Sequence, residues 1–267
     1  MSFLNTVPLV WGLLKEAKHP NLVLSMATPA DCAEHLRRGE ADLGLVPVAE
    51  IARQGLPVLP GTCISSDGPV RSILLISRKP WEEIRTLAGD ANSRTSVVLA
   101  QIILRDRFGV APTVRCQPPV LEAMLANADA ALLIGDSALH VDPDSLPYAV
   151  LDLGEEWKLL TGLPMVFAAW AGPAALEAPW LEAALRDSLS HGQANVDDIV
   201  EQVAATHGVD AQMAHHYLTH HIRFWLEERE MAGMAEFLRR GRAHGLLPEA
   251  AGNDSGRSET FEEVEQP

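Results

Sequence analysis

Short apolar runs alternate with amphipathic stretches along the first part of the chain. Four runs rich in Val, Ile and Leu are bounded by Gly, Pro or Asp and have the length of buried strands. They cover residues 22–27, 41–48, 62–66 and 72–77. The segment 29–40, between the first two runs, predicts a crossover helix. The pattern therefore predicts an α/β unit.

A second alternation begins after Pro80. It predicts strands at 85–90, 113–116 and 129–136, with helices at about 93–108 and 119–128 between them. From about Pro179 to Gly245 the pattern predicts helices alone. We therefore expect two α/β lobes that face each other, with C-terminal helices packed on the first lobe or bridging both.

Composition and charge narrow the classes of partner. The chain has 267 residues and a formal net charge of −15, which argues against nucleic acid or an anionic membrane as a partner because both select basic surfaces. Residues 249–267 are acidic and nearly devoid of apolar side chains, so we expect a disordered tail. The N-terminus resembles no secretory leader and no apolar run is long enough to span a membrane, so a cytoplasmic location is expected.

Polar clusters follow the predicted strands, at the edge where open α/β sheets bind ligands. Asn5 and Thr6 follow the apolar "SFL", a Gly-Pro loop follows the strand at 62–66, and Asp136 follows "AALLIG". The candidate ligand-binding residues of the loop are Ser65, Ser66, Gly68 and Arg71. A turn whose serine side chains bond locally is an equally good interpretation of that loop. Asp136 is a candidate acid–base group, although a carboxylate that orients a neighbour or caps a helix is the more common case.

The segment "NSRTS" stands immediately before the predicted helix 93–108. One side chain suffices to cap a helix, and here several hydroxyls and a guanidinium crowd one N-terminus. Such a surplus of donors around a positive dipole end suits a carboxylate or phosphate, and an over-polar cap is the competing interpretation. The candidate binding residues are Ser93, Arg94, Thr95 and Ser96.

Other chemical signals are weak. His216 and His220 have a spacing that can bind metal on a helix, yet no carboxylate or cysteine pattern completes a site, and a solvated helix face is the better interpretation. The three cysteines have neither disulfide nor metal-ligand spacing. No dinucleotide fingerprint, P-loop, HExxH or nucleophile elbow is present.

Six segments in series resemble one family. They are "SFLNTVPL" (2–9), "ADLGLVPVAE" (41–50), "SSDGPVRSILLIS" (65–77), "DANSRTSVVLAQIIL" (90–104), "DAALLIGDSAL" (129–139) and "DLGEEWKLLTGLPMVFAAW" (152–170). Together they resemble the menaquinone-biosynthesis chorismate dehydratases of the futalosine pathway. The resemblance extends from the first residue to about residue 245.

The resemblance implies the two-lobed fold of periplasmic solute-binding proteins of the second type. It places lobe 1 at 1–77 and 165–247, lobe 2 at 78–164 and a disordered acidic tail at 248–267, with crossings near Ser77–Pro80 and Leu163–Met165. It also implies a hydro-lyase that converts chorismate, a small dianion, to 3-[(1-carboxyvinyl)oxy]benzoate and water without metal or organic cofactor. We expect a monomer or homodimer.

The resemblance also bears on the chemistry. The two polar clusters are candidates to grip the two carboxylates of chorismate, Asn5 to bind the departing hydroxyl or the side-chain carboxylate, and the substrate's own enolpyruvyl carboxylate to accept the proton. Asp136 is the alternative base. Family members usually carry residues before "S-F/Y-L-N"; here Met1 precedes Ser2 directly, so we expect a shortened first strand or a misassigned start.

Two other functions stay open. The sister enzyme that makes 1,4-dihydroxy-6-naphthoate shares the fold, but it opens with a Ser-Pro-Cys-Pro-Asn-Asp-like motif and uses a cleft histidine, neither of which "SFLNTVPL" offers. A non-catalytic protein that binds a small acid is the other alternative.

Overall fold

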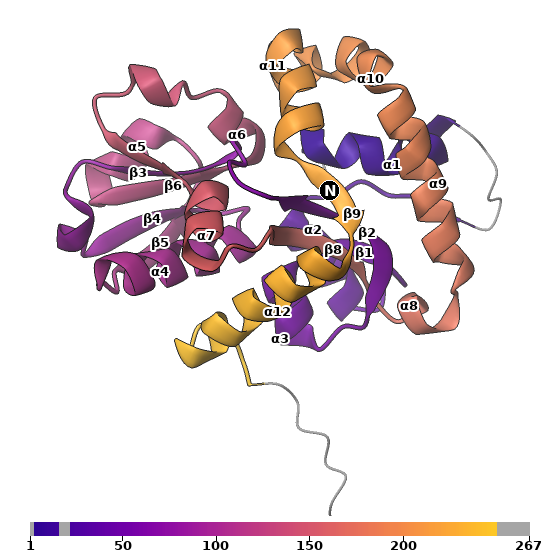
Figure 1. The fold of residues 1–267 in the computed structure, drawn as a ribbon, viewed down its shortest axis with the longest axis horizontal. Coiled ribbons are helices and arrows are strands. Elements are labelled where there is room, and N and C mark those ends of the chain that lie inside the picture. Colours follow the sequence, from indigo (N-terminus) through magenta and orange to yellow (C-terminus); the bar gives the residue numbers. More distant parts are fainter. Residues whose placement is uncertain (1–2, 16–21, 250–267) are drawn as a thin grey trace, which may run out of the picture.

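Two β-sheets form the centres of two lobes in the computed structural model, which describes residues 3–15 and 22–249 (Figure 1). The first sheet has the order β1 (Gly44–Pro47), β8 (Met165–Ala171), β2 (Val58–Ser66), β9 (Arg223–Leu226). The second has the order β5 (Thr113–Gln117), β4 (Thr86–Asp90), β6 (Ala130–Ile134), β3 (Ile73–Ser77), β7 (Ala149–Asp152). The predicted fold class, two sheets flanked by helices with extra C-terminal helices, is confirmed.

Helices accompany both sheets. With the first sheet lie α1 (Val7–Lys15), α2 (Pro29–Arg37), α3 (Val48–Gln54), α8 (Ala174–Glu177), α9 (Trp180–Ala194), α10 (Val196–Val203), α11 (Ala211–His216) and α12 (Glu228–Ala243). With the second lie α4 (Thr95–Phe108), α5 (Leu121–Asn127), α6 (Gly135–Leu139) and α7 (Leu153–Thr161). Among the described residues no helix is both long and apolar enough to cross a membrane.

The second alternation in the sequence folds as expected. Strand β4 pairs in parallel with both β5 and β6, and α4 and α5 supply the two crossovers. Strands β3 and β7 then extend this sheet in antiparallel fashion. Because all five residues of β6 are buried, the strand reads as an unbroken apolar run, which is why its sequence signal is clear.

Three expectations about elements are wrong. Residues 22–27 form no strand: among the described strands β1 pairs with β8 alone, and residues 22–27 line a groove of about 590 Å³ together with residues 40–45. The region after residue 179 is not purely helical, because β9 pairs with the edge of β2. The third concerns residues 3–6: the "SFL" segment leads into a 3-10 helix, Leu4–Thr6, instead of ending a strand.

The first crossing between the lobes lies earlier than expected. Strand β3 belongs to the second sheet, where it fills the place between β6 and β7, so the chain crosses at residues 67–72. It returns between α7 and β8, at residues 162–164. Asp152 links the first crossing to α7, the helix before the second crossing. Its carboxylate accepts hydrogen bonds from the backbone N–H groups of Val70 (2.9 Å) and Arg71 (2.6 Å) and also caps α7. The expected acidic tail at 248–267 lies outside the described residues from 250 onward.

Helix α1 and the 3-10 helix before it are held by a close crossing with α9. Gly12 lies directly against Ser188, where an added Cβ would come within 2.6 Å of the Ser188 Cα. The Ser188 hydroxyl donates to the Leu9 carbonyl (2.8 Å) and accepts from the Leu13 N–H (3.1 Å). This crossing fixes where Asn5 stands relative to the first sheet.

Candidate functional site

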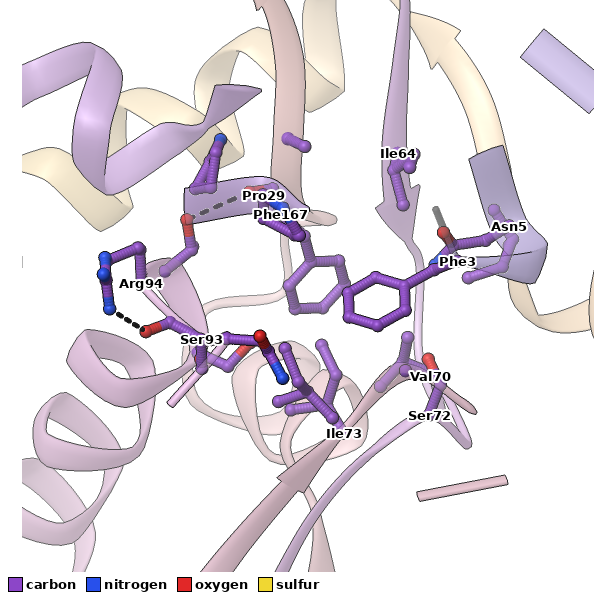
Figure 2. A pocket seen from close by; sticks show the side chains of 18 residues that line it. Phe3, Asn5, Pro29, Ile64, Val70, Ser72, Ile73, Ser93, Arg94 and Phe167 are labelled. Atoms are coloured by element: carbon purple, nitrogen blue, oxygen red, sulfur yellow. Dashed lines mark hydrogen bonds between the residues drawn. The ribbon is translucent and has the colours of Figure 1, made fainter. Parts of the chain in front are cut away.

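A pocket lies between the two sheets, and both lobes line it (Figure 2). The first lobe contributes Asn5 from the 3-10 helix, and the second contributes the segment Asn92–Ser96 before and at the start of α4. Figure 2 shows Ser93 and Arg94 on one side of the pocket and Asn5 and Ser72 on the other. The pocket therefore has two polar ends.

The first polar end is the N-terminus of α4. Arg94 stands at the N-cap position, and no side chain there accepts a hydrogen bond from the first turn. The Ser93 hydroxyl is buried, lines the pocket and has no hydrogen-bond partner. The capping interpretation of the "NSRTS" cluster is therefore not supported. A helix N-terminus with free N–H groups and an unpartnered hydroxyl can bind an anion.

Asp90 supports this end from behind. Its Oδ1 accepts from the backbone N–H (2.9 Å) and the side-chain Nδ2 (3.2 Å) of Asn92. Burial raises the pKa of the Asp90 carboxyl above its ordinary value, while the Asn92 N–H groups act in the opposite direction. The carboxylate thus shapes the turn that presents Asn92 and Ser93 to the pocket.

Arg94 and Thr95 reach across to the first lobe. The Thr95 hydroxyl donates to the Phe167 carbonyl (3.0 Å) and accepts from the Ala49 N–H (3.2 Å). The Arg94 Nε lies 3.9 Å from a carboxylate oxygen of Glu50. These contacts hold the lobes together at the pocket, so the structure is closed.

The second polar end contains Asn5 and Ser72. Both side chains are buried and line the pocket, and both form hydrogen bonds to the phenol of Tyr217. The Asn5 Oδ1 is buried without a partner. Unlike a carboxylate, an amide at this place binds and orients a ligand and is a poor proton acceptor.

Aromatic rings occupy the middle of the pocket. Phe3 and Phe167 lie near one another between the polar ends (Figure 2). Phe3 packs on Gly135, where an added Cβ would meet the ring at 2.9 Å and where φ is +56°. Glycine is required there on both counts.

None of the four candidate residues of the Gly-Pro loop lines the pocket, whereas Val70 and Ser72 of the same loop do. Ser65 donates to the Arg223 carbonyl (3.2 Å), and the Arg71 guanidinium donates to the carbonyls of Ala138 and Val141 (3.0 and 2.5 Å). Neither Ser66 nor Gly68 lines the pocket. The loop thus serves as the connection between the lobes.

Thr6 and Asp136 also lie outside the lining of the pocket. Thr6 faces the separate groove beside β1. The Asp136 carboxylate accepts from the Leu4 N–H (3.2 Å) and lies 2.7 Å from the Nδ1 of His207. Since Asp136 lies in the first turn of α6 in lobe 2 and its partners belong to lobe 1, this carboxylate joins the lobes.

The histidine-rich segment forms a stack of rings. The ring centroids of His216 and His220 are 4.4 Å apart, and the His221 Nδ1 donates to the Pro69 carbonyl (3.0 Å). Within residues 3–15 and 22–249, no group of three His, Cys, Asp or Glu side chains has the geometry to hold a metal ion.

Comparison with known proteins identifies the family. A family model described as menaquinone biosynthesis matches residues 1–243. The chain belongs to the menaquinone-biosynthesis family. This confirms the family suspected from the six segments and places the protein in that pathway, while the activity within the pathway is a separate question.

The fold of this menaquinone-biosynthesis protein recurs in solved structures of low sequence identity. Protein AF1704 from Archaeoglobus fulgidus has a TM-score of 0.74 at 14% identity, covering 92% of this chain and 96% of that one. The periplasmic aliphatic sulphonate binding protein SsuA from Escherichia coli has a TM-score of 0.63 at 16% identity, covering 92% and 85%. A Candida albicans protein described as having the generic periplasmic binding protein fold has a TM-score of 0.63 at 12% identity, covering 93% and 89%. At such identities these likenesses establish the fold alone.

Sequence reasoning missed several residues of this family member's site. The sequence pattern predicts that Phe3 ends a strand and that Ser72 lies where the loop meets the strand at 72–77. It places His207 and Tyr217 among the C-terminal helices and assigns Phe167 to no element. Only the quoted loop "SSDGPVRS" (65–72) carried a signal, since it includes Ser72. Tyr217 lies 212 residues from Asn5 in the sequence, and no local pattern reports such a contact.

Proposed function

We propose that this protein is a chorismate dehydratase, a carbon–oxygen lyase that converts chorismate to 3-[(1-carboxyvinyl)oxy]benzoate and water. The supporting observation is the pocket with an uncapped helix N-terminus at one end, two phenylalanine rings in the middle and Asn5 and Ser72 at the other. Chorismate carries groups that match these three parts of the pocket in order: a carboxylate, a ring and a hydroxyl. The membership in the menaquinone-biosynthesis family supports the same proposal.

The helix end suits the ring carboxylate. Loss of the C3 proton builds negative charge that is conjugated through the ring to this carboxylate, so donors fixed around it lower the barrier. The free N–H groups of α4 and the Ser93 hydroxyl are such donors. They act locally, which allows an acidic protein to bind a dianion.

The proton acceptor we propose is the enolpyruvyl carboxylate of the substrate. Asp136, the candidate protein base, lies outside the pocket lining, and its oxygens are engaged by Leu4 and His207. The pocket side chains Asn5, Ser72 and Ser93 are neutral and do not abstract a proton readily. Orientation of the substrate's own base then supplies the proximity that catalysis needs.

Substrate entry requires the lobes to separate. The closed cavity measures about 60 Å³, and a bound water needs roughly 10–15 Å³ on this measure. The space thus suits a few waters and is far too small for chorismate. We propose that chorismate binds a more open form and that the lobes then close around it, less far than in this structure, and exclude water from the reactive diene.

The direct test is incubation of purified protein with chorismate, followed by ultraviolet spectroscopy and product mass. Formation of the benzoate with the loss of one water supports the proposal. Binding of chorismate without change would instead make the protein a small-acid binding protein. Inertness towards chorismate combined with formation of 1,4-dihydroxy-6-naphthoate from its precursor would identify the sister enzyme.

A second test distinguishes the two candidate bases, the enolpyruvyl carboxylate of the substrate and the carboxylate of Asp136. Asp136→Asn keeps the size of the side chain and removes its charge. We expect kcat to fall by less than about tenfold, since general-base catalysis is typically worth about 10²–10⁴ and Asp136 has a structural place. A fall of more than about a thousandfold with the fold intact would assign the base to Asp136. The cytoplasmic location and the monomer or homodimer remain predictions, to be tested by cell fractionation and light scattering.

A further inference from the structure

A chain of three buried hydroxyl and amide groups runs behind the pocket. The Asn5 Nδ2 donates to the Tyr217 phenol oxygen (2.9 Å), and the Tyr217 hydroxyl donates to the Ser72 Oγ (2.8 Å). All three residues are at most 8% exposed. Asn5 and Ser72 line the pocket and Tyr217 does not. The phenol is therefore the buried central group of a hydrogen-bond relay whose two end residues line the pocket.

Counting hydrogens fixes what each end offers. The single hydrogen of the Tyr217 hydroxyl points to Ser72, so the phenol oxygen is an acceptor towards Asn5. The Asn5 amide is thereby oriented with Nδ2 towards the tyrosine, and its Oδ1 is left buried without a partner. The Ser72 oxygen already accepts, so its own hydrogen is free to donate. The pocket thus receives one acceptor and one donor.

The three residues come from distant parts of the fold. Asn5 lies in the 3-10 helix Leu4–Thr6, Ser72 in the connection just before β3, and Tyr217 at the start of the π-helical turn Tyr217–His221. Such widened turns occur frequently at functional sites. The last residue before β9, Ile222, also lines the pocket. The turn thus carries the phenol to the back of the site.

We propose that Tyr217 is a positioning residue that presents Asn5 and Ser72 together to the leaving hydroxyl of the substrate. This inference rests on the proposed dehydratase function. Because both side chains lie within hydrogen-bonding distance of one phenol oxygen, they are close enough to bind one small group. Asn5 Oδ1 accepts the hydrogen of the substrate hydroxyl, and Ser72 donates to its oxygen.

The relay strengthens as the reaction proceeds. The C3 proton passes to the enolpyruvyl carboxylate, the electron pair of the C3–H bond forms the new ring double bond, and the C4–O bond breaks. Oxygen leaves with negative charge and takes up the same proton, so that water forms and the carboxylate is regenerated. Ser72 stabilises this charge at the oxygen, and donation along Asn5, Tyr217 and Ser72 polarises each successive donor.

Tyr217 itself does not exchange a proton. Burial raises the pKa of its phenol well above the ordinary value, with the hydrogen bonds to Ser72 and Asn5 acting in the opposite direction. The hydroxyl therefore stays protonated and keeps its direction of donation throughout the working range of pH.

The experiment is Tyr217→Phe, which removes only the hydroxyl, with steady-state kinetics on chorismate and thermal unfolding. We expect kcat to fall about 10–100-fold, the effect of losing a hydrogen bond that supports a developing charge, with KM changed by less than about threefold. The matched control is Tyr148→Phe. Tyr148 is the other of the two tyrosines in the chain, is 36% exposed and lies outside the pocket. It should leave both constants unchanged.

Two further variants exclude a merely structural role. Because Tyr217 acts through Asn5 and Ser72 together, the loss of kcat in the double variant of Tyr217→Phe and Asn5→Ala should be smaller than the product of the two single losses, a non-additivity expected for residues acting as one unit. Multiplicative losses, or a Tyr217→Phe variant within twofold of wild type, would overturn the relay and leave the dehydratase proposal standing. A wild-type protein that does not dehydrate chorismate would instead overturn the proposed function, and the relay with it.

Discussion

At the scale of single residues, buried hydroxyls differ in whether they have a partner. The Ser65 hydroxyl donates to the Arg223 carbonyl across β2 and β9, whereas the Ser93 hydroxyl is buried without a partner and faces the pocket. A buried polar group without a partner destabilises a fold by about 1–3 kcal/mol. Such a group makes sense at a site where a ligand supplies the missing bond.

These two serines give opposite predictions. Ser93→Ala should weaken chorismate binding by about tenfold, since it removes one hydrogen bond to a charged group, and should leave the free energy of unfolding unchanged or slightly higher. Ser65→Ala, the matched control, should lower the free energy of unfolding by about 1 kcal/mol and leave binding unchanged. Calorimetric titration and urea unfolding of both variants measure this. Equal effects of the two variants on binding would contradict the assignment of Ser93 to the anion.

At the scale of elements, the site depends on how α1 is seated. The 3-10 helix that carries Asn5 continues into α1, and α1 crosses α9 so closely that Gly12 contacts the backbone of Ser188. Displacement of α1 therefore moves Asn5. The sequence offers no sign of this coupling, because a glycine in a helix normally only lowers its propensity.

Gly12→Ala should separate α1 from α9. Although alanine favours helix, the added Cβ has no space, and overpacking should lower the free energy of unfolding by about 1–3 kcal/mol. The turnover of chorismate should fall as well, because Asn5 is displaced. Ser190→Ala, on an exposed face of α9, is the control. Chemical unfolding monitored by circular dichroism distinguishes them, and an unchanged midpoint for Gly12→Ala would contradict the close crossing.

Ion pairs on helix α12 make a contribution to the free energy of unfolding that depends on pH. Hydrogen bonds from Arg239, with Arg240 adding to them, lower the pKa of Glu236 to about 2. An unfolded glutamate has a pKa of about 4.3, so this contribution is present at neutral pH and is lost as the pH falls from about 5 towards 2. Glu236→Gln should thus lower the free energy of unfolding by about 1 kcal/mol at pH 7.

The same variant should converge with wild type in acid. Urea unfolding at pH 7, 5, 4 and 3 measures the difference between them, which should shrink as the pH falls. A difference that is constant over this range would show that the ion pairs contribute nothing through ionisation.

At the scale of the whole molecule, polar contacts join the two lobes at two places, at the pocket and beside α12. Thr95 bonds to Phe167 and Ala49 at the pocket. Asp106 on α4 pairs with Arg240 in the last turn of α12 (2.5 Å) and with His244 just after it (2.7 Å). Separation of the lobes must break the Thr95 hydrogen bonds, because they cross from one lobe to the other at the pocket. Closure and ligand binding are therefore coupled.

Thr95→Val keeps the shape of the side chain and removes both bonds. Each lost bond costs about 0.5–1.5 kcal/mol, so the ligand-free protein should populate the open form more and show a larger radius of gyration in X-ray scattering. Chorismate should bring the radius to that of the wild type with chorismate bound, with roughly tenfold weaker apparent affinity. Thr113→Val, at an exposed position of β5, is the control. A wild-type radius for Thr95→Val without ligand would contradict this coupling.

The sequence predicted the parts of this protein that local chemistry controls. Strands β3 and β6 of the second lobe are buried and almost wholly apolar, the "NSRTS" cluster marks the start of α4 by its own polarity, and the six segments identify the family. The sequence-based prediction was wrong at 22–27, which have a strand-like composition but form no strand. It also missed β9, a strand of four residues that pairs with β2.

What the tertiary structure decided is which polar groups share a pocket. Ser65, Arg71 and Asp136 are polar like Ser93 and Asn5, yet packing turns the first three towards backbone groups or the other lobe, whereas the last two line the pocket. Residue types and periodicity determine elements because these depend on neighbours along the chain. The site depends on contacts between segments as distant as Asn5 and Tyr217, and only folding brings these together.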